Sequence, residues 1–226
     1  MAKRIKIHPV TPHQKRIFDV VDHLKNEEIF VFPTDSQYAI GCDYQNKKGI
    51  DRIRKIRQLD KDHLLTLLCD SLSNISKFAR ISDDNFKIIK RLIPGPYTFV
   101  LPATKEVPKL LLNPKRSTIG FRVPDYPITQ KIIEDLGHPI IATTAKLPDH
   151  NGRDIKYQDR EELFQGLDKL VDVIIDDEQD LSKQESTVID MTGDEAILLR
   201  RGLGIEKAEE VFAQYDKQLV EEVEQI

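Results

Sequence analysis

The sequence has no tryptophan and only two cysteines among its 226 residues, and it contains no long apolar run. No stretch approaches the roughly 18 apolar residues of a membrane-spanning helix, so we expect no contact with a membrane. The N-terminus, MAKRIKIHPV, is basic but lacks the apolar segment of a signal peptide. Cys42 and Cys69 each lie in an apolar, strand-like run, which is typical of buried thiols in a reducing compartment. These absences predict a cytoplasmic protein without a disulfide framework.

Three common catalytic fingerprints are also missing. The chain has no Gly-x-x-x-x-Gly-Lys-Ser/Thr loop, no Gly-x-Gly-x-x-Gly after a strand, and no Gly-x-Ser-x-Gly elbow. Its six histidines show no metal-ligand spacing, so placement on the surface or on helix faces accounts better for most of them. The sequence therefore predicts no metal centre and no ordinary hydrolase site, and it singles out no catalytic residue.

Apolar runs of strand length alternate with segments of helical periodicity. Strands are predicted at EIFVF, YAIGCD, LLTLLC, YTFVLPA, STIGFRVP, PIIATT, KLVDVIIDD, STVIDM and AILLRRG, the last two joined as a hairpin. Helices are predicted before EIFVF, over KKGIDRIRKIRQ, after the N-caps Ser71 and Ser82, from Pro127 to Gly137, and at the acidic C-terminus. Residues 149–158 are predicted as a loop. This alternation indicates one α/β domain, with a mixed sheet because of the late hairpin.

Charge is unevenly distributed, although the net charge is only −4. Residues 47–61 carry seven Lys and Arg against two Asp, whereas residues 206–226 carry seven acids against two lysines. The basic segment is a candidate anion-binding site, and its plain alternative is a solvated helix face. The acidic segment would repel phosphates, so we expect residues 206–226 to form a peripheral C-terminal helix outside the site.

Polar and basic side chains cluster where predicted strands end or flank a helix. The clusters are Pro33 to Tyr38, Arg54 to Arg57, Thr98, Arg122, Thr143 to Lys146, Ser186-Thr187 and Arg200-Arg201. In open α/β sheets, ligands gather beyond strand ends. Arginines and hydroxyls converging there would suit a polyphosphate, because guanidinium groups bind phosphate oxygens bidentately. Each cluster alone also fits a surface or packing role, and spacing along the sequence does not prove that the clusters converge.

The stretch FPTDSQYAIGCD, residues 32–43, resembles the Pro-Thr-Asp-Thr-x-Tyr-Gly-Leu-Gly opening motif of the YrdC family. KIR at residues 55–57 matches the family's Lys-x-Arg, and PGPYTFVL, TIGFRVPDYP, STVIDMTG and LLRRG resemble further segments in the same order. The resemblance covers residues 5–203 and is closest to the YciO branch, which PTDSQYAIGC and KRSTIGFRVP follow in detail. It implies a YrdC-like domain over residues 5–205, with a twisted mixed sheet and flanking helices around a concave basic cavity.

The resemblance also implies an activity and a binding site. The family's characterised enzymes make threonylcarbamoyl-adenylate from ATP, L-threonine and bicarbonate, and that product feeds N6-threonylcarbamoyladenosine synthesis on tRNA. ATP would bring Mg²⁺, held mainly by phosphates and water. The residues that we predict to bind substrate or nucleotide are Thr34, Tyr38, Lys55, Arg57, Thr98, Arg122, Thr144, Lys146, Ser186 and Arg200.

Most of these residues have an expected role if the synthase chemistry holds. The phosphates would be held by Lys55, Arg57 and Arg200. Thr34 and Tyr38 would line the pocket for the threonine or its carbamate. In addition, Ser186 would bond the phosphate region and Thr144 the reacting group. Such a site needs positioning and charge stabilisation more than a general base.

One position departs from the synthase pattern. Synthases carry Ser-x-Asn after the strand that corresponds to PIIATT, whereas this chain has Thr144, Ala145 and Lys146. Asparagine offers both a donor and an acceptor, whereas lysine offers only donors. We therefore predict a nucleotide-binding protein with weak synthase activity.

Two alternatives stay open at the level of sequence. The chain could be a non-catalytic protein that binds tRNA or double-stranded RNA through its basic helix and concave face. Aromatic residues make up 7% of the chain, which favours backbone and shape recognition over base stacking. The chain could also be an enzyme that hydrolyses threonylcarbamoyl-adenylate or the modified nucleoside.

Overall fold

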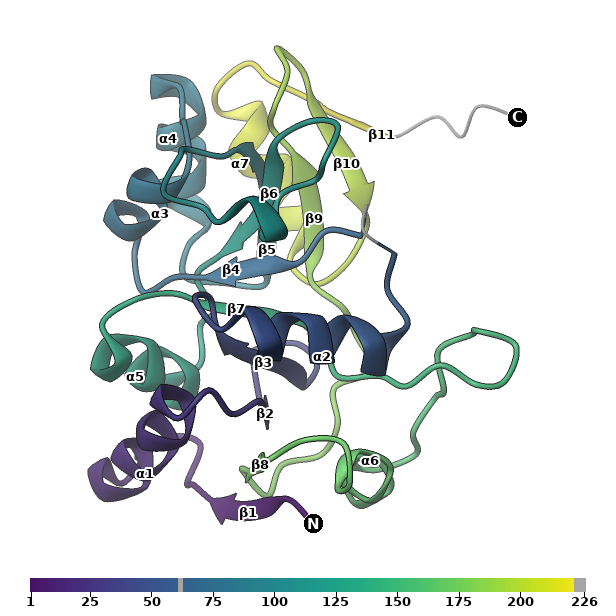
Figure 1. The fold of residues 1–226 in the computed structure, drawn as a ribbon. Coiled ribbons are helices and arrows are strands. Elements are labelled where there is room, and N and C mark those ends of the chain that lie inside the picture. The colour runs from purple at the N-terminus through teal and green to yellow at the C-terminus, as the bar shows by residue number, and fades with distance from the viewer. Residues whose placement is uncertain (61–62, 222–226) are drawn as a thin grey trace.

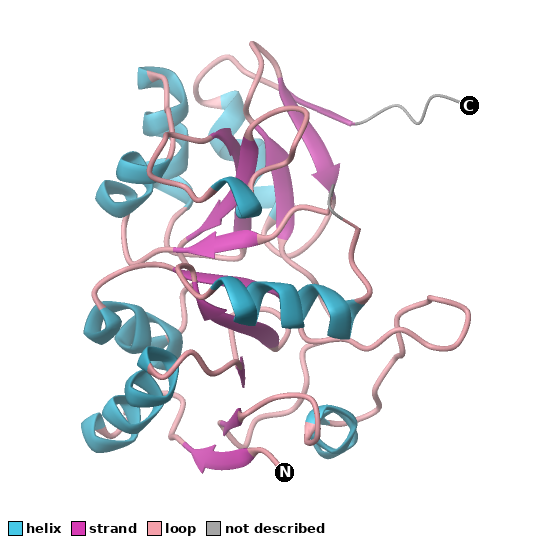
Figure 2. Cartoon of the chain, in the orientation of Figure 1, coloured by secondary structure: helices cyan, strands magenta, loops and turns pink. Residues whose placement is uncertain are grey.

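The computed structural model describes residues 1–60 and 63–221, and within them the chain forms one sheet of eleven strands with seven α-helices (Figures 1 and 2). The strands are β1 (Lys3–Lys6), β2 (Phe30–Phe32), β3 (Ala39–Asp43), β4 (Thr66–Leu68), β5 (Tyr97–Pro102), β6 (Thr118–Arg122), β7 (Ile140–Thr144), β8 (Val173–Asp176), β9 (Thr187–Asp190), β10 (Ala196–Arg200) and β11 (Leu219–Glu221). The helices are α1 (Gln14–Lys25), α2 (Lys47–Arg57), α3 (Leu72–Phe78), α4 (Asp83–Leu92), the short 3-10 helix η1 (Lys109–Leu111), α5 (Pro127–Leu136), α6 (Arg160–Leu167) and α7 (Ile205–Ala213).

The sheet mixes parallel and antiparallel neighbours in the order β1-β8-β2-β3-β7-β4-β6-β5-β9-β10-β11. β9 and β10 form the predicted antiparallel hairpin, whereas β9 pairs in parallel with β5. In the middle of the sheet, β4 lies between β7, which runs antiparallel to it, and β6, which runs parallel. The predicted α/β class with a twisted mixed sheet and flanking helices is therefore confirmed.

Helices pack on both faces of the sheet and form two apolar clusters. α1 and α5, which lie side by side in Figure 1, share the smaller cluster with strand residues such as Leu68 and Ile140. The larger cluster holds buried residues of α2, α3, α4, α6 and α7 together with Leu67 and Ile141. Because successive strand side chains point to opposite faces, neighbouring residues fall in different clusters.

Besides the short η1, three elements lack a clear sequence signal and were not predicted. In β1, Lys-Arg-Ile-Lys buries only Ile5, so it carries almost no apolar pattern, and it gains its place by pairing with β8 at the edge. α6 is short and begins at the N-cap Asp159, whose carboxylate accepts from Glu162 N. β11 is a three-residue strand that pairs in parallel with β10.

Several local predictions are confirmed. Ser71 and Ser82 cap α3 and α4, each accepting a hydrogen bond from the backbone amide three residues on. Both cysteines are buried and free. No helix in the part of the chain that the structure describes is long and apolar enough to span a membrane.

The acidic C-terminal segment differs from its prediction. Its helix, α7, ends at Ala213 and is followed by β11 instead of continuing, and residues 222–226 lie outside the described part of the chain. The helix is not peripheral, because Ala208, Val211 and Phe212 are buried in the larger cluster. Acidic composition dominates the sequence pattern, but the few apolar positions on one helical face decide the packing.

Candidate functional site

A cavity of about 540 Å³ lies over the middle of the sheet, and we call it the central cavity. Its floor is made by four neighbouring strands, each contributing residues two positions apart: Thr66 and Leu68, Thr98 and Val100, Gly120 and Arg122, Ala142 and Thr144. Residues two apart in a strand share one face of the sheet. The sheet therefore collects side chains from distant parts of the sequence on one surface.

Gly120 keeps this floor hollow. A Cβ at this position would lie 3.0 Å from Thr98 Cγ2 and 3.1 Å from Thr66 Oγ1. Any larger side chain would therefore crowd the space between the two hydroxyl-bearing strand residues, which is the space that a ligand would use.

Nine of the ten predicted binding residues line the central cavity. They are Thr34, Tyr38, Arg57, Thr98, Arg122, Thr144, Lys146, Ser186 and Arg200. The tenth, Lys55, is exposed on α2 and is not part of the lining. The prediction that Lys55 holds a phosphate together with Arg57 therefore does not fit this arrangement, because the two side chains leave the helix in different directions.

Arg57 enters the cavity from the last residue of α2. Its Nη1 donates to Lys146 O and to Asp154 Oδ1, each at 2.9 Å, and its side chain is 6% exposed. The other terminal nitrogen, Nη2, forms no hydrogen bond with a described residue. Arg57 thus ties the loop after β7 to α2 and keeps one donor for a ligand.

His63 lines the same side of the cavity. The loss of water around its ring, and next the positive charges of Arg57 and Arg54, lower the pKa of His63 from its usual value. The positive charges of Arg57 and Arg54 thus act on the His63 ring in addition to the loss of water.

Arg122 is buried at the opposite side of the floor and pairs with Asp35. Its Nη2 also donates to Ser36 Oγ at 3.0 Å, while Nη1 forms no hydrogen bond with a described residue. Asp35 Oδ2 in turn accepts from Asp125 N at 3.0 Å. The polar loop between β2 and β3 is therefore shaped around a buried arginine, which explains the unusual run of polar residues there.

Thr34 and Ser36 stabilise that loop internally. Thr34 Oγ1 donates to Gln37 O at 2.7 Å and accepts from Ser36 N at 3.1 Å. Both of these polar side chains are buried. Thr34 lines the cavity as predicted, but its hydroxyl is already used to hold the loop.

Lys146 and Arg200 meet on one carboxylate, that of Glu185. Lys146 Nζ donates to Glu185 Oε1, and Arg200 Nη1 lies 3.0 Å from Glu185 Oε2. Lys146 Nζ is also 3.5 Å from Asp154 Oδ2. Burial alone would raise the pKa of Glu185, but the hydrogen bond from Lys146 and the charge of Arg200 outweigh it and lower that pKa.

Arg200 connects this group to the hydroxyls of the floor. Its Nε and Nη2 donate to the backbone oxygen and to Oγ of Ser186, at 2.9 and 3.0 Å. Ser186 Oγ lies 3.4 Å from Thr98 Oγ1. Thr144, in contrast, forms no side-chain hydrogen bond with a described residue, so its hydroxyl is available to a ligand.

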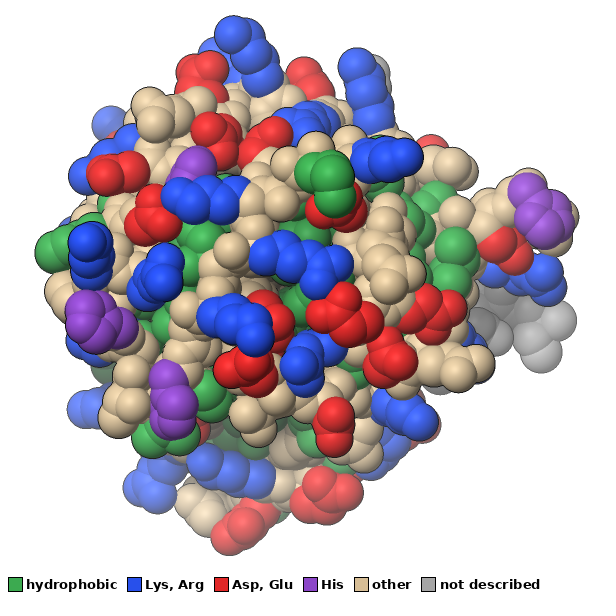
Figure 3. Space-filling model, turned by 90° about the horizontal axis from the view of Figure 1, so that it is seen from below, with side chains coloured by type: hydrophobic (Ala, Val, Ile, Leu, Met, Phe, Trp, Pro, Cys, Tyr) green, Lys and Arg blue, Asp and Glu red, His purple; other side chains and the backbone are tan. Residues whose placement is uncertain are grey.

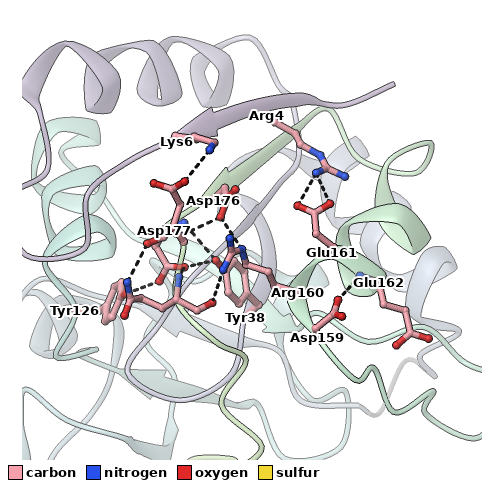
Figure 4. Close-up of polar contacts among 12 residues, drawn as sticks. Arg4, Lys6, Tyr38, Tyr126, Asp159, Arg160, Glu161, Glu162, Asp176 and Asp177 are labelled. Atoms are coloured by element: carbon pink, nitrogen blue, oxygen red, sulfur yellow. Dashed lines mark hydrogen bonds and ion pairs between the residues drawn. The ribbon is translucent and has the colours of Figure 1, made fainter.

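Tyr38 was predicted to line the pocket for threonine or its carbamate, but its hydroxyl is bound to a residue of the protein. Tyr38 and Tyr126 both donate to the buried carboxylate of Asp177, directly after β8 (Figure 4). Burial, followed by the hydrogen bond to Asp177, raises the pKa of both tyrosines. Tyr38 is therefore a lining residue whose ring packs edge-on against Phe164 in the larger cluster, and its hydroxyl anchors the end of the loop.

Sequence reasoning missed four residues of the site and its support: His63, Asp154, Asp177 and Glu185. Asp154 lies in the predicted loop over residues 149–158, which projects from the body of the molecule in Figure 2 and has no helix or strand. Single polar residues in such segments carry no periodic signal, so only their contacts in the folded structure reveal them. No group of three His, Cys, Asp or Glu residues within residues 1–60 and 63–221 could hold a metal ion.

A family model named Sua5/YciO/YrdC, with the description "Telomere recombination", matches residues 22–202. The chain belongs to this family. It is 41% identical over 204 residues to the uncharacterized protein YciO of Escherichia coli strain K12, which covers 90% of this chain and 97% of that protein. The crystal structure of E. coli YciO matches with a TM-score of 0.84 and 40% identity, covering 92% of this chain and 99% of that one. The predicted family and its YciO branch are confirmed.

Similarity also extends to enzymes of known activity. The threonylcarbamoyl-AMP synthase of Vibrio vulnificus strain YJ016 is 30% identical over 131 residues, which are 57% of this chain and 70% of that enzyme. P. abyssi Sua5, solved in complex with L-threonine, shares the fold with a TM-score of 0.84 at 24% identity, over 97% of this chain and 62% of that one. The chain is thus related to threonylcarbamoyl-AMP synthases.

Proposed function

We propose that the central cavity binds a nucleotide, with its phosphates at Arg57, Arg122 and Arg200, and that the protein is a weak threonylcarbamoyl-AMP synthase. One observation carries the proposal: four cationic side chains from four separate segments converge on one polar cavity. Arg57 Nη2 and Arg122 Nη1 are donors without a partner among the described residues. Charge-assisted bonds from guanidinium groups to phosphate are about twice as strong as hydrogen bonds between neutral groups.

Threonine and bicarbonate are the co-substrates that kinship with the synthases suggests. The carbamate of threonine would attack the α-phosphorus of ATP, and pyrophosphate would leave. Thr144 offers a hydroxyl without a partner among the described residues, near Lys146, for the reacting group. The chain would act by orienting the reactants and stabilising charge, since no general base is needed for a carbamate.

Mg²⁺ would accompany ATP in this scheme. Asp154 and Glu185, two carboxylates of the cavity lining, are both engaged by cations of the chain. They fit a supporting role better than direct ligation, so the ion would be held by phosphate oxygens and water. It would neutralise part of the charge that develops on the leaving pyrophosphate.

Lys146 is the reason to expect weak synthesis. Its ammonium is held by Glu185 and Asp154, so it neither accepts a hydrogen bond from a substrate nor moves freely toward one. A substrate donor that relied on the asparagine carbonyl of the synthases would be left without a partner. An unpaired buried polar group costs about 1–3 kcal/mol.

The experiment is a titration of the purified protein with ATP, followed by incubation with ATP, L-threonine and bicarbonate. We expect saturable ATP binding and slow pyrophosphate release that stops when either threonine or bicarbonate is omitted. Absence of any nucleotide binding would reject the proposal. Pyrophosphate release independent of threonine would mean that the cavity performs another reaction, such as simple hydrolysis.

No specific observation favours the RNA-binding alternative over the nucleotide proposal. On the face shown in Figure 3, acidic side chains are interspersed among the basic ones and do not leave a continuous positive surface. On the basic helix α2, Lys48 Nζ lies 3.7 Å from Glu27 Oε2, and Arg52 and Arg57 pair with Asp172 and Asp154. Backbone recognition of RNA needs several cations that are free to replace counterions.

A further inference from the structure

Glu185 holds an unusual position for an acid in a cavity that we expect to bind phosphate. It lies on the connection between β8 and β9, and its carboxylate reaches between Lys146 and Arg200. Its two oxygens contact one cation each, which is the arrangement that two oxygens of a ligand phosphate or carboxylate would adopt. The Glu185 side chain is 30% exposed, so a ligand in the cavity can reach it.

The acids of the site nearly balance its cations. Arg57 pairs with Asp154, Arg122 pairs with Asp35, and Lys146 and Arg200 share Glu185. With these groups in their ordinary ionisation states, four positive charges face three negative ones, so the net charge of the set is about +1. A nucleoside triphosphate brings far more negative charge than this residue set can match.

We propose that Glu185 is a specificity-determining residue: its carboxylate occupies the anion position between Lys146 and Arg200, so that the cavity favours phosphate ligands of low charge over polyphosphates. The favoured class is a nucleoside monophosphate or a phosphate diester such as an acyl-adenylate. A polyphosphate would have to displace the Glu185 carboxylate, or bind beside it against repulsion. This inference rests on the proposed nucleotide site and narrows the class of ligand that the site takes.

The backbone at Glu185 is fixed by its neighbours. Only the side chain of Glu185 therefore competes with a ligand phosphate for Lys146 and Arg200. Leu203 N donates to Glu185 O at 2.8 Å, and the neighbouring Ser186 forms a β-bridge with Leu203. A Cβ at Gly202 would lie 2.5 Å from Glu185 O, so the two segments are in close contact. Replacing Glu185 by glutamine therefore removes the charge while the size and the backbone stay the same.

The test compares Glu185→Gln with the wild-type protein by calorimetric titration in Mg²⁺-free buffer, using orthophosphate, pyrophosphate, AMP and ATP. We expect pyrophosphate and ATP to bind about tenfold more tightly to the variant, a change equivalent to about one regained charge-assisted contact. Orthophosphate and AMP should change by less than about threefold on the same reasoning. Asp180→Asn is the matched control, because Asp180 is an exposed acid on the same connection, outside the cavity lining, and should leave all four affinities unchanged.

The outcomes separate this inference from the proposed function. If pyrophosphate responds as expected but neither nucleotide binds to either protein, the charge preference stands and the nucleotide function fails. If the nucleotides bind but Glu185→Gln leaves pyrophosphate and ATP unchanged, strengthens all four ligands equally, or weakens them, the role of Glu185 is overturned. Should Glu185→Gln not fold, Glu185→Asp retracts the carboxylate by one carbon and should give a smaller shift in the same direction; no shift there would reject the inference.

Discussion

Lys55 and Arg57 lie two residues apart on α2, yet Arg57 is buried at the central cavity and Lys55 is exposed outside it. An α-helix turns by about 100° per residue, so side chains two positions apart leave it on nearly opposite sides. The Lys-x-Arg motif therefore cannot present both cations to one ligand from a regular helix. It supplies one cation to the site and one to the solvent.

The first prediction separates these two residues. Arg57→Ala should weaken nucleotide binding about 10- to 100-fold, since a hydrogen bond to a charged group is worth about 1.5–3 kcal/mol. Lys55→Ala should change the affinity less than twofold and serves as the matched control. Both affinities can be measured by calorimetric titration with AMP. Equal losses in the two variants would mean that Lys55 also reaches the ligand.

Lys146→Asn should raise the synthase activity. The substitution provides the hydrogen-bond acceptor that asparagine supplies in the synthases. It also removes the ammonium group, which Glu185 and Asp154 hold in the cavity. If the lost contact is felt only in the transition state, about 1–3 kcal/mol corresponds to about one to two decades in rate. The measurement is pyrophosphate release that requires both threonine and bicarbonate. A wild-type protein that already turns over as fast as the variant would show that lysine is compatible with synthesis.

Asp177 should stabilise the fold through Tyr38 and Tyr126. In Asp177→Ala the buried hydroxyl of Tyr38 and the partly buried hydroxyl of Tyr126 lose their acceptor, so the free energy of unfolding should fall by about 3 kcal/mol. Tyr126→Phe removes one donor and leaves the other pair in place, so its loss should be about 1 kcal/mol. Urea unfolding of the two variants checks both values. A variant Asp177→Ala as stable as the wild-type protein would contradict this account.

The C-terminal helix should matter for stability despite its acidic composition. Phe212 is fully buried in the larger cluster, so Phe212→Ala should cost about 3–5 kcal/mol of unfolding free energy. Val220, which is exposed on β11, provides the control, and Val220→Ala should cost less than about 1 kcal/mol. Removal of residues 208–226 takes away the buried side chains of α7 and should therefore destabilise the protein strongly. Thermal unfolding of the truncated chain tests this.

His63 offers a probe of the charge in the cavity. Its lowered pKa means that the folded protein disfavours the protonated imidazole, so stability should fall as pH drops below the usual value of 6.5. Arg57→Ala removes a nearby positive charge and should raise the pKa of His63, and a bound phosphate should do the same. NMR titration of the imidazole signals measures both shifts. No response to either change would place His63 away from the anion site.

Part of the site follows from local patterns alone. The polar run from Thr34 to Tyr38, the arginines at strand ends and the hydroxyls of Thr98 and Ser186 are visible in the sequence, because strand ends are where sheets expose polar side chains to a ligand. Their convergence on one cavity is not visible, because it depends on the order of strands in the sheet. β4 and β5, for example, are separated by β6, which comes later in the chain.

The sequence by itself determined the α/β class, most strands and helices, and nine of the residues that line the cavity, because periodicity and family-like motifs are local properties. Only the tertiary structure decided which charges meet. Arg57 and Asp154 are 97 residues apart, and Lys146 and Glu185 are 39 apart. Such pairs leave no mark on local propensity, since an ion pair depends on distance in space and on the burial that strengthens it. Tertiary contacts also place the Tyr38 hydroxyl on Asp177. They make Glu185, which has no sequence signal, the partner of both Lys146 and Arg200 in the central cavity.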